Sequence, residues 1–332
     1  MITRFGLLTL VLTLAMGGAA HAQMRVGWQT GDVNTEFTFA VETKKFEGEG
    51  LRLELKPFPA GPAMLPALAA GEIDVAWLGE FPAVTGFVNG LPLEVFMAQH
   101  MHGSHIRLVA RPEAGIKTLR DLKGTKIGVS IGSTGHFHLL RALAVAGLSQ
   151  QDVTLINLAP ATMPPAYVAG QIDAALTWEP HVGEMEARGA VRLATTESLG
   201  LITGVVGVAR KAYLVEHPDD IQKFLKAWDA TITVYQKTPA EVMPYEARRL
   251  GKSPSDFARL VERQNLIVPS MQEQLTAEYL GRPGEQANCR ILTYMRDIAH
   301  FLLTIDRIKA EPTDWSGLIN VRPLVAYVQN PR

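Results

Sequence analysis

The chain has 332 residues, of which 47% are hydrophobic and 20% are charged, and this composition excludes intrinsic disorder as the main state. A formal net charge of -1 argues against a general nucleic-acid binder, because such proteins need an excess of basic residues to neutralise phosphates. The single cysteine, Cys289, excludes an internal disulfide, cysteine-based zinc sites and iron–sulfur clusters.

Residues 1–22 have the pattern of a secretory signal peptide. Arg4 precedes an apolar run over residues 5–16, and Ala20-His21-Ala22 supplies the small residues of a signal peptidase site. The apolar run is too short to span a bilayer comfortably as a helix, and no later run reaches that length. We therefore predict cleavage near Ala22 and an exported, periplasmic chain.

Each half of the following sequence alternates strands with helices. Strands are predicted at 24–28, 51–58, 73–78, 126–130, 153–157 and 172–177, and helices at 36–46, 63–70, 137–146 and 165–169. This alternation predicts parallel sheets with helices on both faces. Ligands of such sheets bind beyond the carboxyl ends of the strands, so we expect one cleft lined by residues 28–31, 79–82, 132–136 and 178–181.

An internal repeat relates the two halves. Gly71-Glu-Ile-Asp-Val-Ala-Trp-Leu-Gly-Glu80 returns roughly 100 residues later as Gly170-Gln-Ile-Asp-Ala-Ala-Leu-Thr-Trp-Glu179. Upstream, Gly27-Trp-Gln-Thr-Gly31 is similar to Gly128-Val-Ser-Ile-Gly132. Solenoid repeats have periods of about 20–50 residues, so this single large spacing predicts two similar lobes instead.

The remaining pattern predicts how the lobes are joined. Two apolar stretches, residues 105–111 and 204–211, are predicted to form a hinge of two crossing segments. Helices are predicted at 221–238, 239–250, 254–266, 271–280 and 288–308, as an extension packed on the first lobe. The predicted organisation is therefore a signal peptide (1–22), a discontinuous first lobe (23–107 and 206–332) and a second lobe (108–205).

Seven short motifs carry a family resemblance: Gln29-Thr30, Ala69-Ala-Gly-Glu-Ile-Asp74, Leu78-Gly79, Leu119-Arg-Asp-Leu-Lys-Gly124, Ser133-Thr-Gly-His136, Trp178-Glu-Pro180 and Val208-Ala-Arg-Lys211. With them, the chain resembles the periplasmic solute-binding proteins of ABC importers, especially the taurine, alkanesulfonate and nitrate group. The resemblance implies an α/β, two-lobed type II periplasmic binding protein fold with a C-terminal helical extension. It also implies a small-molecule solute, a membrane permease with a cytoplasmic ATPase, no cofactor and a monomeric, non-enzymatic protein.

Candidate ligand-binding residues lie at or near the predicted strand ends and the hinge: Trp28, Gln29, Thr30, Gly79, Glu80, Phe81, His105, Ser133, Thr134, His136, Trp178 and Glu179. Ser133 and Thr134 precede a predicted helix, whose free N–H groups favour an anion such as a sulfonate. Glu80 and Glu179 occupy equivalent places in the repeat and are expected to face an ammonium group from opposite sides. Plain helix capping and solvent-exposed carboxylates are the alternative interpretations.

The solute itself stays open at this point. Glu80 stands where the resemblance leads us to expect a small hydroxyl residue, and Val205 where it leads us to expect a pocket aspartate. Taurine or a related aminosulfonate is the predicted ligand, and a cationic amine or another nitrogenous solute is the alternative. A ligand-binding subunit of a sensor would need the same closing cleft.

Two further patterns offer other chemistry. His100, His102 and His105 form a run whose imidazoles could bind a transition metal, line the cleft or simply pack. Gly128-Val-Ser130-Ile-Gly132 matches the G-x-S-x-G motif of hydrolases, which makes a serine hydrolase using Ser130 another alternative. The repeat gives these glycines a turn role instead, and we predict no metal site and no catalysis.

Overall fold

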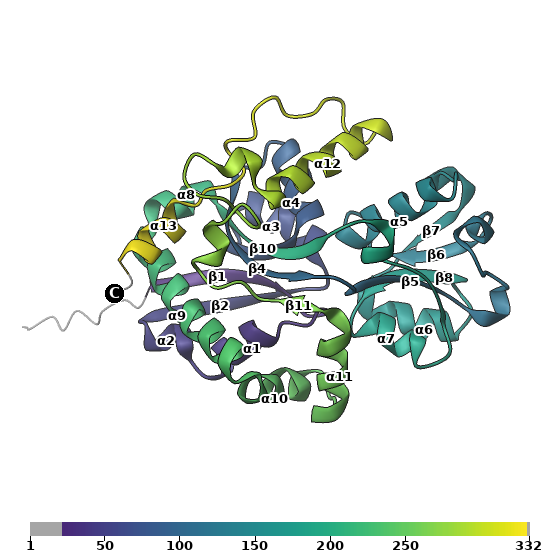
Figure 1. Cartoon of the computed structure of the whole chain (residues 1–332), viewed down its shortest axis with the longest axis horizontal. Helices are drawn as coiled ribbons and strands as arrows, with labels where there is room; N and C mark the ends of the chain where they lie inside the picture. Colours follow the sequence, from purple (N-terminus) through teal and green to yellow (C-terminus); the bar gives the residue numbers. More distant parts are fainter. Residues whose placement is uncertain (1–21, 331–332) are drawn as a thin grey trace, which may run out of the picture.

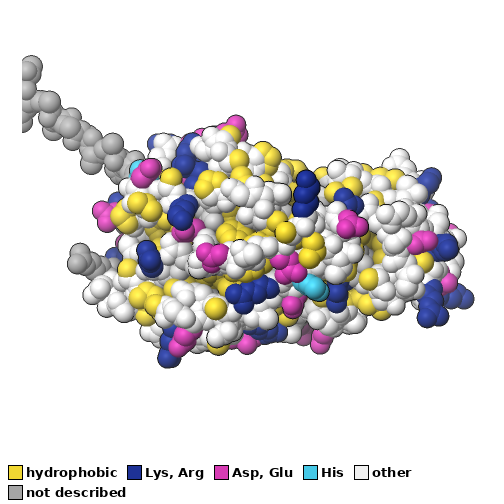
Figure 2. All heavy atoms as spheres, turned by 90° about the horizontal axis from the view of Figure 1, so that it is seen from above, with side chains coloured by type: hydrophobic (Ala, Val, Ile, Leu, Met, Phe, Trp, Pro, Cys, Tyr) yellow, Lys and Arg dark blue, Asp and Glu magenta, His cyan; other side chains and the backbone are white. Residues whose placement is uncertain are grey.

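The computed structural model describes residues 22–330, which form two α/β lobes side by side (Figure 1). The predicted signal peptide falls on residues 1–21, outside the described residues, and on Ala22 at their edge. Within the described part, the helices are too short or too polar to cross a membrane. Figure 2 shows basic and acidic side chains scattered over one face of the molecule, in keeping with the near-neutral net charge.

The first lobe is built on a six-stranded sheet. Its strand order is β11 (Leu266–Ile267), β4 (Leu93–His102), β10 (Thr203–Arg210), β3 (Val75–Gly79), β1 (Ala22–Gln29) and β2 (Leu51–Phe58). The strands β1, β2 and β3 are parallel, whereas β10 pairs antiparallel with β3 and β4, and β4 with β11.

The second lobe repeats this arrangement with five strands. Their order is β7 (Thr154–Asn157), β6 (Lys126–Val129), β8 (Ala174–Trp178), β5 (Ile106–Ala110) and β9 (Val191–Thr195). The strands β7, β6 and β8 are parallel, and β5 is antiparallel to β8 and β9. The chain passes between the sheets at residues 103–105 and 196–202, so the predicted boundaries at 107 and 205 fall inside β5 and β10.

The repeated Gly and Ile positions have an architectural role. A Cβ at Gly27 of β1 would overlap the side chain of Ile73, and a Cβ at Gly128 of β6 would overlap Ile172 in the same way. Each isoleucine therefore packs directly on the first strand of its lobe, at a place where only glycine leaves room.

The repeated aspartates also act on the backbone. Asp74 Oδ2 accepts a hydrogen bond from the N–H of Arg25 at 3.0 Å, and Asp173 Oδ2 accepts one from Lys126 at 2.8 Å. In both lobes the aspartate thus satisfies a donor at the entry to the parallel pairing. The internal repeat therefore encodes the scaffold, and the predicted fold class is confirmed.

Helices cover both faces of each sheet (Figure 1). In the first lobe they are α1 (Thr35–Glu42), α2 (Lys45–Gly48), α3 (Met64–Ala69), α4 (Glu80–Val88), α8 (Lys211–Glu216), α9 (Pro218–Lys237), α10 (Pro239–Arg249), α11 (Pro254–Gln264), α12 (Arg290–Thr304) and α13 (Arg322–Gln329). In the second lobe they are α5 (Thr134–Val145), α6 (Met163–Val168) and α7 (His181–Glu186).

Two helix predictions are wrong in detail. The helix predicted over 36–46 is divided into α1 and α2, because Lys44 adopts a left-handed conformation with φ of 57°. The helix predicted over 271–280 is only a single 3-10 turn at Glu273–Leu275. There, the buried Gln274 Oε1 accepts a hydrogen bond from the N–H of Ala98 at 2.8 Å, and this contact with the sheet turns the chain.

The C-terminal extension contacts both lobes. The helix α9 packs on α1, α2 and β2 of the first lobe, as predicted. The helix α12 also reaches α5 of the second lobe, where the rings of Phe301 and Phe137 lie 5.5 Å apart and the Arg141 guanidinium stacks over Phe301. Residues of α5 therefore belong to the apolar core of the first lobe, among them Phe137 and Leu140.

Candidate functional site

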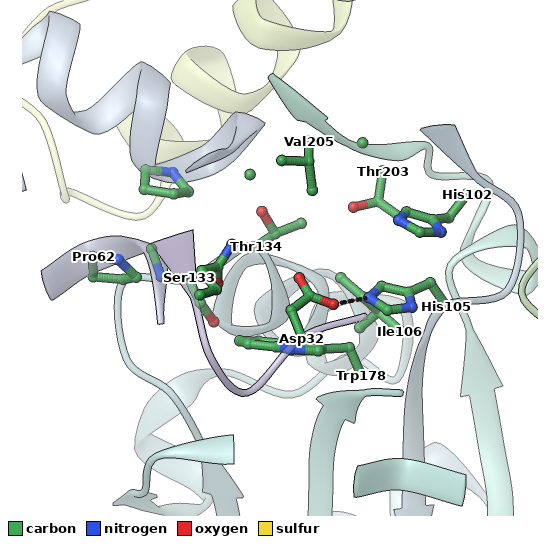
Figure 3. Close-up of a pocket in the computed structure, with 15 residues that line it drawn as sticks. Asp32, Pro62, His102, His105, Ile106, Ser133, Thr134, Trp178, Thr203 and Val205 are labelled. Carbon is green, nitrogen blue, oxygen red and sulfur yellow. Dashed lines mark hydrogen bonds and ion pairs between the residues drawn. The ribbon is translucent and has the colours of Figure 1, made fainter. Parts of the chain in front are cut away.

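A small cavity of about 30 Å³ lies between the two lobes (Figure 3). Such a volume holds about two water molecules. Its walls come from the loops and helix starts that follow the parallel strands, together with the crossing segments. The lining residues are Gln29, Asp32, Gly61, Pro62, Gly79, Pro82, His102, His105, Ile106, Ser133, Thr134, Trp178, Thr203, Gly204 and Val205.

The structure brings half of the predicted site residues to this cavity: Gln29, Gly79, His105, Ser133, Thr134 and Trp178. The other predicted residues lie outside its lining: Trp28, Thr30, Glu80, Phe81, His136 and Glu179. Polar lining residues that the sequence did not single out for the cleft are Asp32 and Thr203, whereas for His102, which also lines the cavity, lining the cleft was one of three interpretations.

The N-terminus of α5 opens onto the cavity. Ser133 caps this helix, because its Oγ accepts a hydrogen bond from the N–H of His136 at 3.2 Å and donates one to Ser130 O at 2.6 Å. Both the capping interpretation and the cleft position of Ser133 therefore hold. The neighbouring Thr134 Oγ1 is buried near the Glu80 carboxyl but makes no well-formed hydrogen bond, so its hydroxyl is available at this end of the cavity.

A second helix start approaches from the first lobe. Gly79 precedes α4 with extended backbone geometry and lies opposite Thr134. A Cβ at Gly79 would overlap Thr134 Oγ1, so glycine permits this close approach of the two lobes. The N-terminal ends of α4 and α5 thus meet at the same cavity, with their positive dipole ends toward it.

Asp32 supplies a carboxylate to the cavity. Its Oδ1 accepts a hydrogen bond from the N–H of Val33 at 2.7 Å and lies 3.0 Å from His105 Nε2. Figure 3 shows the other carboxylate oxygen directed into the cavity, above the ring of Trp178. The sequence did not identify Asp32, because the predicted cleft segment after β1 ended at Gly31, one residue earlier.

A column of histidine rings leads away from Asp32 into the first lobe. The rings of His105 and His102 stack, whereas those of His102 and His100 meet edge to face. The ring centroids of His105 and His102 are 4.0 Å apart, and those of His102 and His100 are 4.4 Å apart. At the inner end, His100 Nδ1 lies 3.6 Å from Glu36 Oε2. Burial and the two neighbouring histidines hold the pKa of His102 well below its ordinary value, so His102 is neutral.

Glu80 lies behind the cavity wall. Its Oε2 accepts a hydrogen bond from the N–H of Gly204 at 3.3 Å, and its carboxyl borders a separate apolar cavity of about 10 Å³ with Met101 and Tyr294. Burial raises the pKa of Glu80 to about 7, although its own backbone N–H, the Gly204 N–H and the nearby hydroxyls of Thr203 and Thr134 oppose this shift. The carboxyl at the start of α4 therefore does not face the cleft in the way the repeat led us to expect.

Glu179 is engaged by arginine. Its Oε1 lies 2.5 Å from Arg107 Nη2, and Arg107 also contacts Glu186 at 3.0 Å. Glu179 and Arg107 are both almost completely buried. The positive partner comes from the antiparallel strand β5, which the repeat does not include. The expectation that Glu80 and Glu179 face an ammonium group from opposite sides of the cleft is therefore wrong.

Trp28 and Thr30 support the loop after β1 from outside the cavity. Trp28 packs against Phe37 and beneath the guanidinium of Arg249, which lies 5.2 Å from its ring centroid. Thr30 is exposed, and its hydroxyl donates to Phe58 O. Both residues thus position the chain around Asp32.

Phe81 and His136 lie within the packing between α4 and α5. The rings of Phe81 and Phe137 stack with centroids 5.6 Å apart. His136 Nδ1 accepts a hydrogen bond from the N–H of Gly132 at 3.3 Å, and burial lowers the pKa of His136 to about 4. A neutral His136 therefore holds the turn that presents Ser133 to the cavity.

A pair of hydrogen bonds closes one side of the cavity across the lobes. The carbonyl of Gly31 accepts from Trp178 Nε1 at 2.9 Å and from His181 Nε2 at 3.0 Å. Gly31 belongs to the first lobe, whereas Trp178 and His181 belong to the second. We call these three residues the interlobe latch.

In the part of the chain that the structure describes, neither the histidine run nor the G-x-S-x-G motif forms a separate site. Within residues 22–330, no three or more metal-ligating side chains are arranged to hold a metal ion, and the rings of His102 and His105 stack instead of converging. Among the hydrogen bonds of the described residues, none joins the Ser130 hydroxyl to a histidine or a carboxylate. Ser130 contributes its backbone carbonyl to the cap of α5.

Comparison with known proteins identifies the class of this molecule. Residues 34–242 match the family described as NMT1/THI5 like, and the chain belongs to this family. It is 30% identical over 295 residues to the taurine-binding periplasmic protein of Escherichia coli K12, covering 86% of each chain. The resemblance inferred from the sequence motifs is thereby confirmed.

Solved structures share the fold. The alkanesulfonate-binding protein SsuA of Xanthomonas axonopodis pv. citri, bound to MOPS, matches with a TM-score of 0.72 at 24% identity, over 87% of this chain and 95% of that chain. The periplasmic aliphatic sulphonate binding protein SsuA of Escherichia coli matches with a TM-score of 0.68 at 23% identity, over 87% and 94%. These likenesses establish the periplasmic binding protein fold for both lobes together.

Proposed function

We propose that this protein is the periplasmic substrate-binding component of an ABC importer, and that it captures a small aminosulfonate of the taurine class. The observation that carries the ligand class is the pairing of two opposite features at one interlobe cavity. One is the start of α5 with the available Thr134 hydroxyl, and the other is the carboxylate of Asp32. The names of the relatives support the transport role.

The sulfonate end of the ligand is bound at the helix starts. The first N–H groups of α5 have no partner within the helix, and the helix dipole favours negative charge there. Thr134 Oγ1 adds a hydroxyl donor, and Gly79 lets α4 approach the same point. A sulfonate has three acceptor oxygens and suits several donors that converge in this way.

The ammonium end is bound by Asp32, and the ring of Trp178 covers the ligand. This assignment replaces Glu80 and Glu179, which are held by Gly204 and Arg107. A carboxylate that is buried and directed into a cavity favours a cationic partner. The cavity of about 30 Å³ is smaller than an aminosulfonate, so the lobes must move apart to admit the ligand between Asp32 and the helix start.

Capture involves closure and no chemical step. A ligand that contacts both lobes favours the closed state by its differential affinity for that state. The closed protein then delivers the solute to the membrane permease, whose cytoplasmic ATPase drives import. We infer that the exported chain acts as a monomer in the periplasm.

The test is a calorimetric titration with taurine of the protein and two cap variants. Ser133→Ala removes the cap of α5 and a lining hydroxyl, whereas Ser253→Ala removes the equivalent cap of α11, where Ser253 Oγ accepts from Asp256 N–H at 3.1 Å. We expect Ser133→Ala to weaken taurine binding about tenfold, because loss of the cap disorders the first turn of α5, whose N–H groups hold the sulfonate, and a hydrogen bond to a charged group contributes roughly 1.5–3 kcal/mol. Ser253→Ala should leave the affinity unchanged.

The same titration separates the alternatives. Equal losses in the two variants would contradict an anion site at α5 and leave only a capping role for Ser133. Binding of simple amines without a sulfonate, at the affinity of taurine, would favour the cationic-amine alternative. Binding of neither class would contradict the proposed function.

A further inference from the structure

The charge balance of the cavity is unusual for an anion site. Its lining includes Asp32 but no lysine or arginine. Two arginines contact the backbone of residues at or beside the lining, and both are already paired with carboxylates. Arg107 contacts Glu179 and Glu186, and Arg249 contacts Glu246 at 2.6 Å. A sulfonate without an ammonium group would therefore be buried beside an uncompensated carboxylate.

One titratable group can compensate for the negative charge of Asp32 when such a sulfonate binds. His105 lines the cavity, is almost completely buried, and lies 3.0 Å from Asp32 Oδ1. When His105 gains a proton, the pair becomes neutral overall, and Asp32 no longer repels an anion. The stacked His102 cannot take this role, because it has no carboxylate partner and its pKa is held low by burial.

The charged groups around the pair contact backbone atoms or other side chains, so His105 is free to gain or lose a proton. From α10, Arg249 Nη2 donates to the backbone carbonyl of Asp32 at 2.5 Å. From α7, His181 donates to Gly31 O, and its pKa is lowered chiefly by burial. On β5, Arg107 donates to the backbone carbonyl of Ser104. Farther along the histidine column are His100 and Glu36, which lie next to each other. From α4, the Glu80 carboxyl, whose pKa burial raises to about 7, lies near Thr203 and Thr134; its titration acts on both kinds of sulfonate alike, so the ratio of their affinities isolates the pair.

We propose that His105 and Asp32 form a proton-adjustable pair that decides which sulfonates the site accepts. A sulfonate that lacks an ammonium group binds with uptake of one proton from solvent onto His105. An aminosulfonate binds without proton uptake, because its own ammonium group neutralises Asp32. The inference rests on the proposed function and assigns its charge selectivity to these two residues.

Proton uptake makes the affinity depend on pH. If one proton is taken up on binding, the dissociation constant rises about tenfold for each pH unit. The affinity for a simple alkanesulfonate should therefore fall as the pH rises from 6 to 8. The affinity for taurine should stay flat over the same range. The ratio of the two affinities thus changes with pH, in favour of the aminosulfonate.

The experiment counts protons by calorimetry. Taurine and propane-1-sulfonate form a matched pair, because the second replaces the ammonium group with a methyl group. Each is titrated into the purified protein at several pH values, in buffers of different ionisation enthalpy. The buffers contain no sulfonate, since SsuA of Xanthomonas is known with MOPS bound. We expect uptake approaching one proton for propane-1-sulfonate at pH 8 and close to zero for taurine.

A variant tests whether the proton taken up on binding goes to His105. His105→Gln retains an amide that can contact Asp32 but cannot be protonated. We expect its affinity for propane-1-sulfonate to become independent of pH and to fall about tenfold at pH 6. Its affinity for taurine should fall by a clearly smaller factor, because the ammonium group of taurine supplies the positive charge. His300→Gln is the control, because His300 pairs with Glu311 at 2.8 Å on the exposed side of α12. It should behave as the unmodified protein.

Each outcome of these titrations either supports or overturns the proposed pair. Equal proton uptake for the two ligands, whether zero or one, overturns the adjustable pair and leaves the proposed function intact. Proton uptake that persists in His105→Gln overturns the role of His105. If His105→Gln does not fold, the proton count of the unmodified protein still decides. Failure of both ligands to bind overturns the proposed function and the pair with it.

Discussion

Glu80 and Glu179 have equivalent positions in the repeat but different surroundings. Glu80 borders an apolar cavity and has only backbone N–H groups and hydroxyls as neighbouring donors, so burial keeps its proton on up to about pH 7. Glu179 lies against the guanidinium of Arg107 and forms an ion pair with it. The two carboxyl groups are thus buried in different ways, Glu80 as a protonated group and Glu179 in an ion pair, because different strands pass beside them.

At Glu80 we predict a pH-dependent contribution to stability. Its pKa is raised from 4.5 to about 7 in the folded state, so the folded state holds more protons between these pH values. The contribution is complete below about pH 4.5 and is lost as the pH rises to 7. Urea unfolding should show Glu80→Gln gaining up to about 3 kcal/mol relative to the unmodified protein across this range.

The comparison must be made between the two proteins, because His136 has the opposite effect. Its pKa is lowered to about 4, so the stability that it contributes grows as the pH rises through the same window. A difference between Glu80→Gln and the unmodified protein that stays constant from pH 4.5 to 7 would contradict the raised pKa of Glu80.

At Glu179 we predict a loss of stability without a change in ligand selectivity. Glu179→Gln should lower the free energy of unfolding by about 3 kcal/mol, because it weakens a buried ion pair. Glu42→Gln is the control, since Glu42 pairs with Arg248 at 2.5 Å on the surface and should cost less than about 1 kcal/mol. A selective loss of taurine over propane-1-sulfonate would instead restore the ammonium role of Glu179.

At the scale of elements, the lobes meet on two sides of the cavity by different means. On one side, α5 and α12 pack through aromatic rings, as between Phe137 and Phe301. On the other side, the interlobe latch consists of two hydrogen bonds to a single carbonyl. Apolar packing tolerates small rotations, whereas a hydrogen bond is directional. We infer that opening occurs mainly on the side of the latch.

The latch leads to a kinetic prediction. Trp178→Phe keeps an aromatic cavity wall but removes the Nε1 donor to Gly31 O. A hydrogen bond contributes about 1 kcal/mol, so ligand dissociation should accelerate about fivefold, and association should change little. Stopped-flow fluorescence measures both rates. Trp315→Phe, which removes a tryptophan stacked on Phe87, is the control, and an unchanged dissociation rate in Trp178→Phe would contradict the latch.

At the scale of the whole molecule, the two sheets do not correspond to two independent cores. Phe137 and Leu140 of α5 are buried with residues of the first lobe, whereas Leu139 is buried in the core of the second lobe. The helix α5 therefore has one face in each core. The lobes are coupled through this helix as well as through the crossing segments.

We therefore predict a single calorimetric unfolding transition. Phe137→Ala should lower its midpoint and divide it into two transitions, because the substitution removes the ring that α5 places in the first core. Leu139→Ala is the matched control, since it creates a cavity in the second core only and should lower the midpoint without dividing the transition. Two separate transitions in the unmodified protein would contradict the coupling.

The sequence by itself determined the repeated scaffold. Strand and helix periodicity, the glycines beneath Ile73 and Ile172, and the aspartates beside the first strands all act on the backbone within about 50 residues. Such local requirements produce sequence patterns from which the strands and helices can be predicted. The positions of Ser133 and Thr134 at the cleft were predictable for the same reason, because a helix start after a strand fixes its own location.

Only the tertiary structure decided which carboxylate lines the cavity. Glu80, Glu179 and Asp32 all follow parallel strands, and nothing local distinguishes them. Arg107 reaches Glu179 from β5, and Gly204 reaches Glu80 from β10. Asp32 instead meets His105 at the crossing segment and keeps one oxygen toward the cavity. The direction of a buried charge depends on partners distant in sequence, because the energy of its burial is set by the groups that arrive beside it.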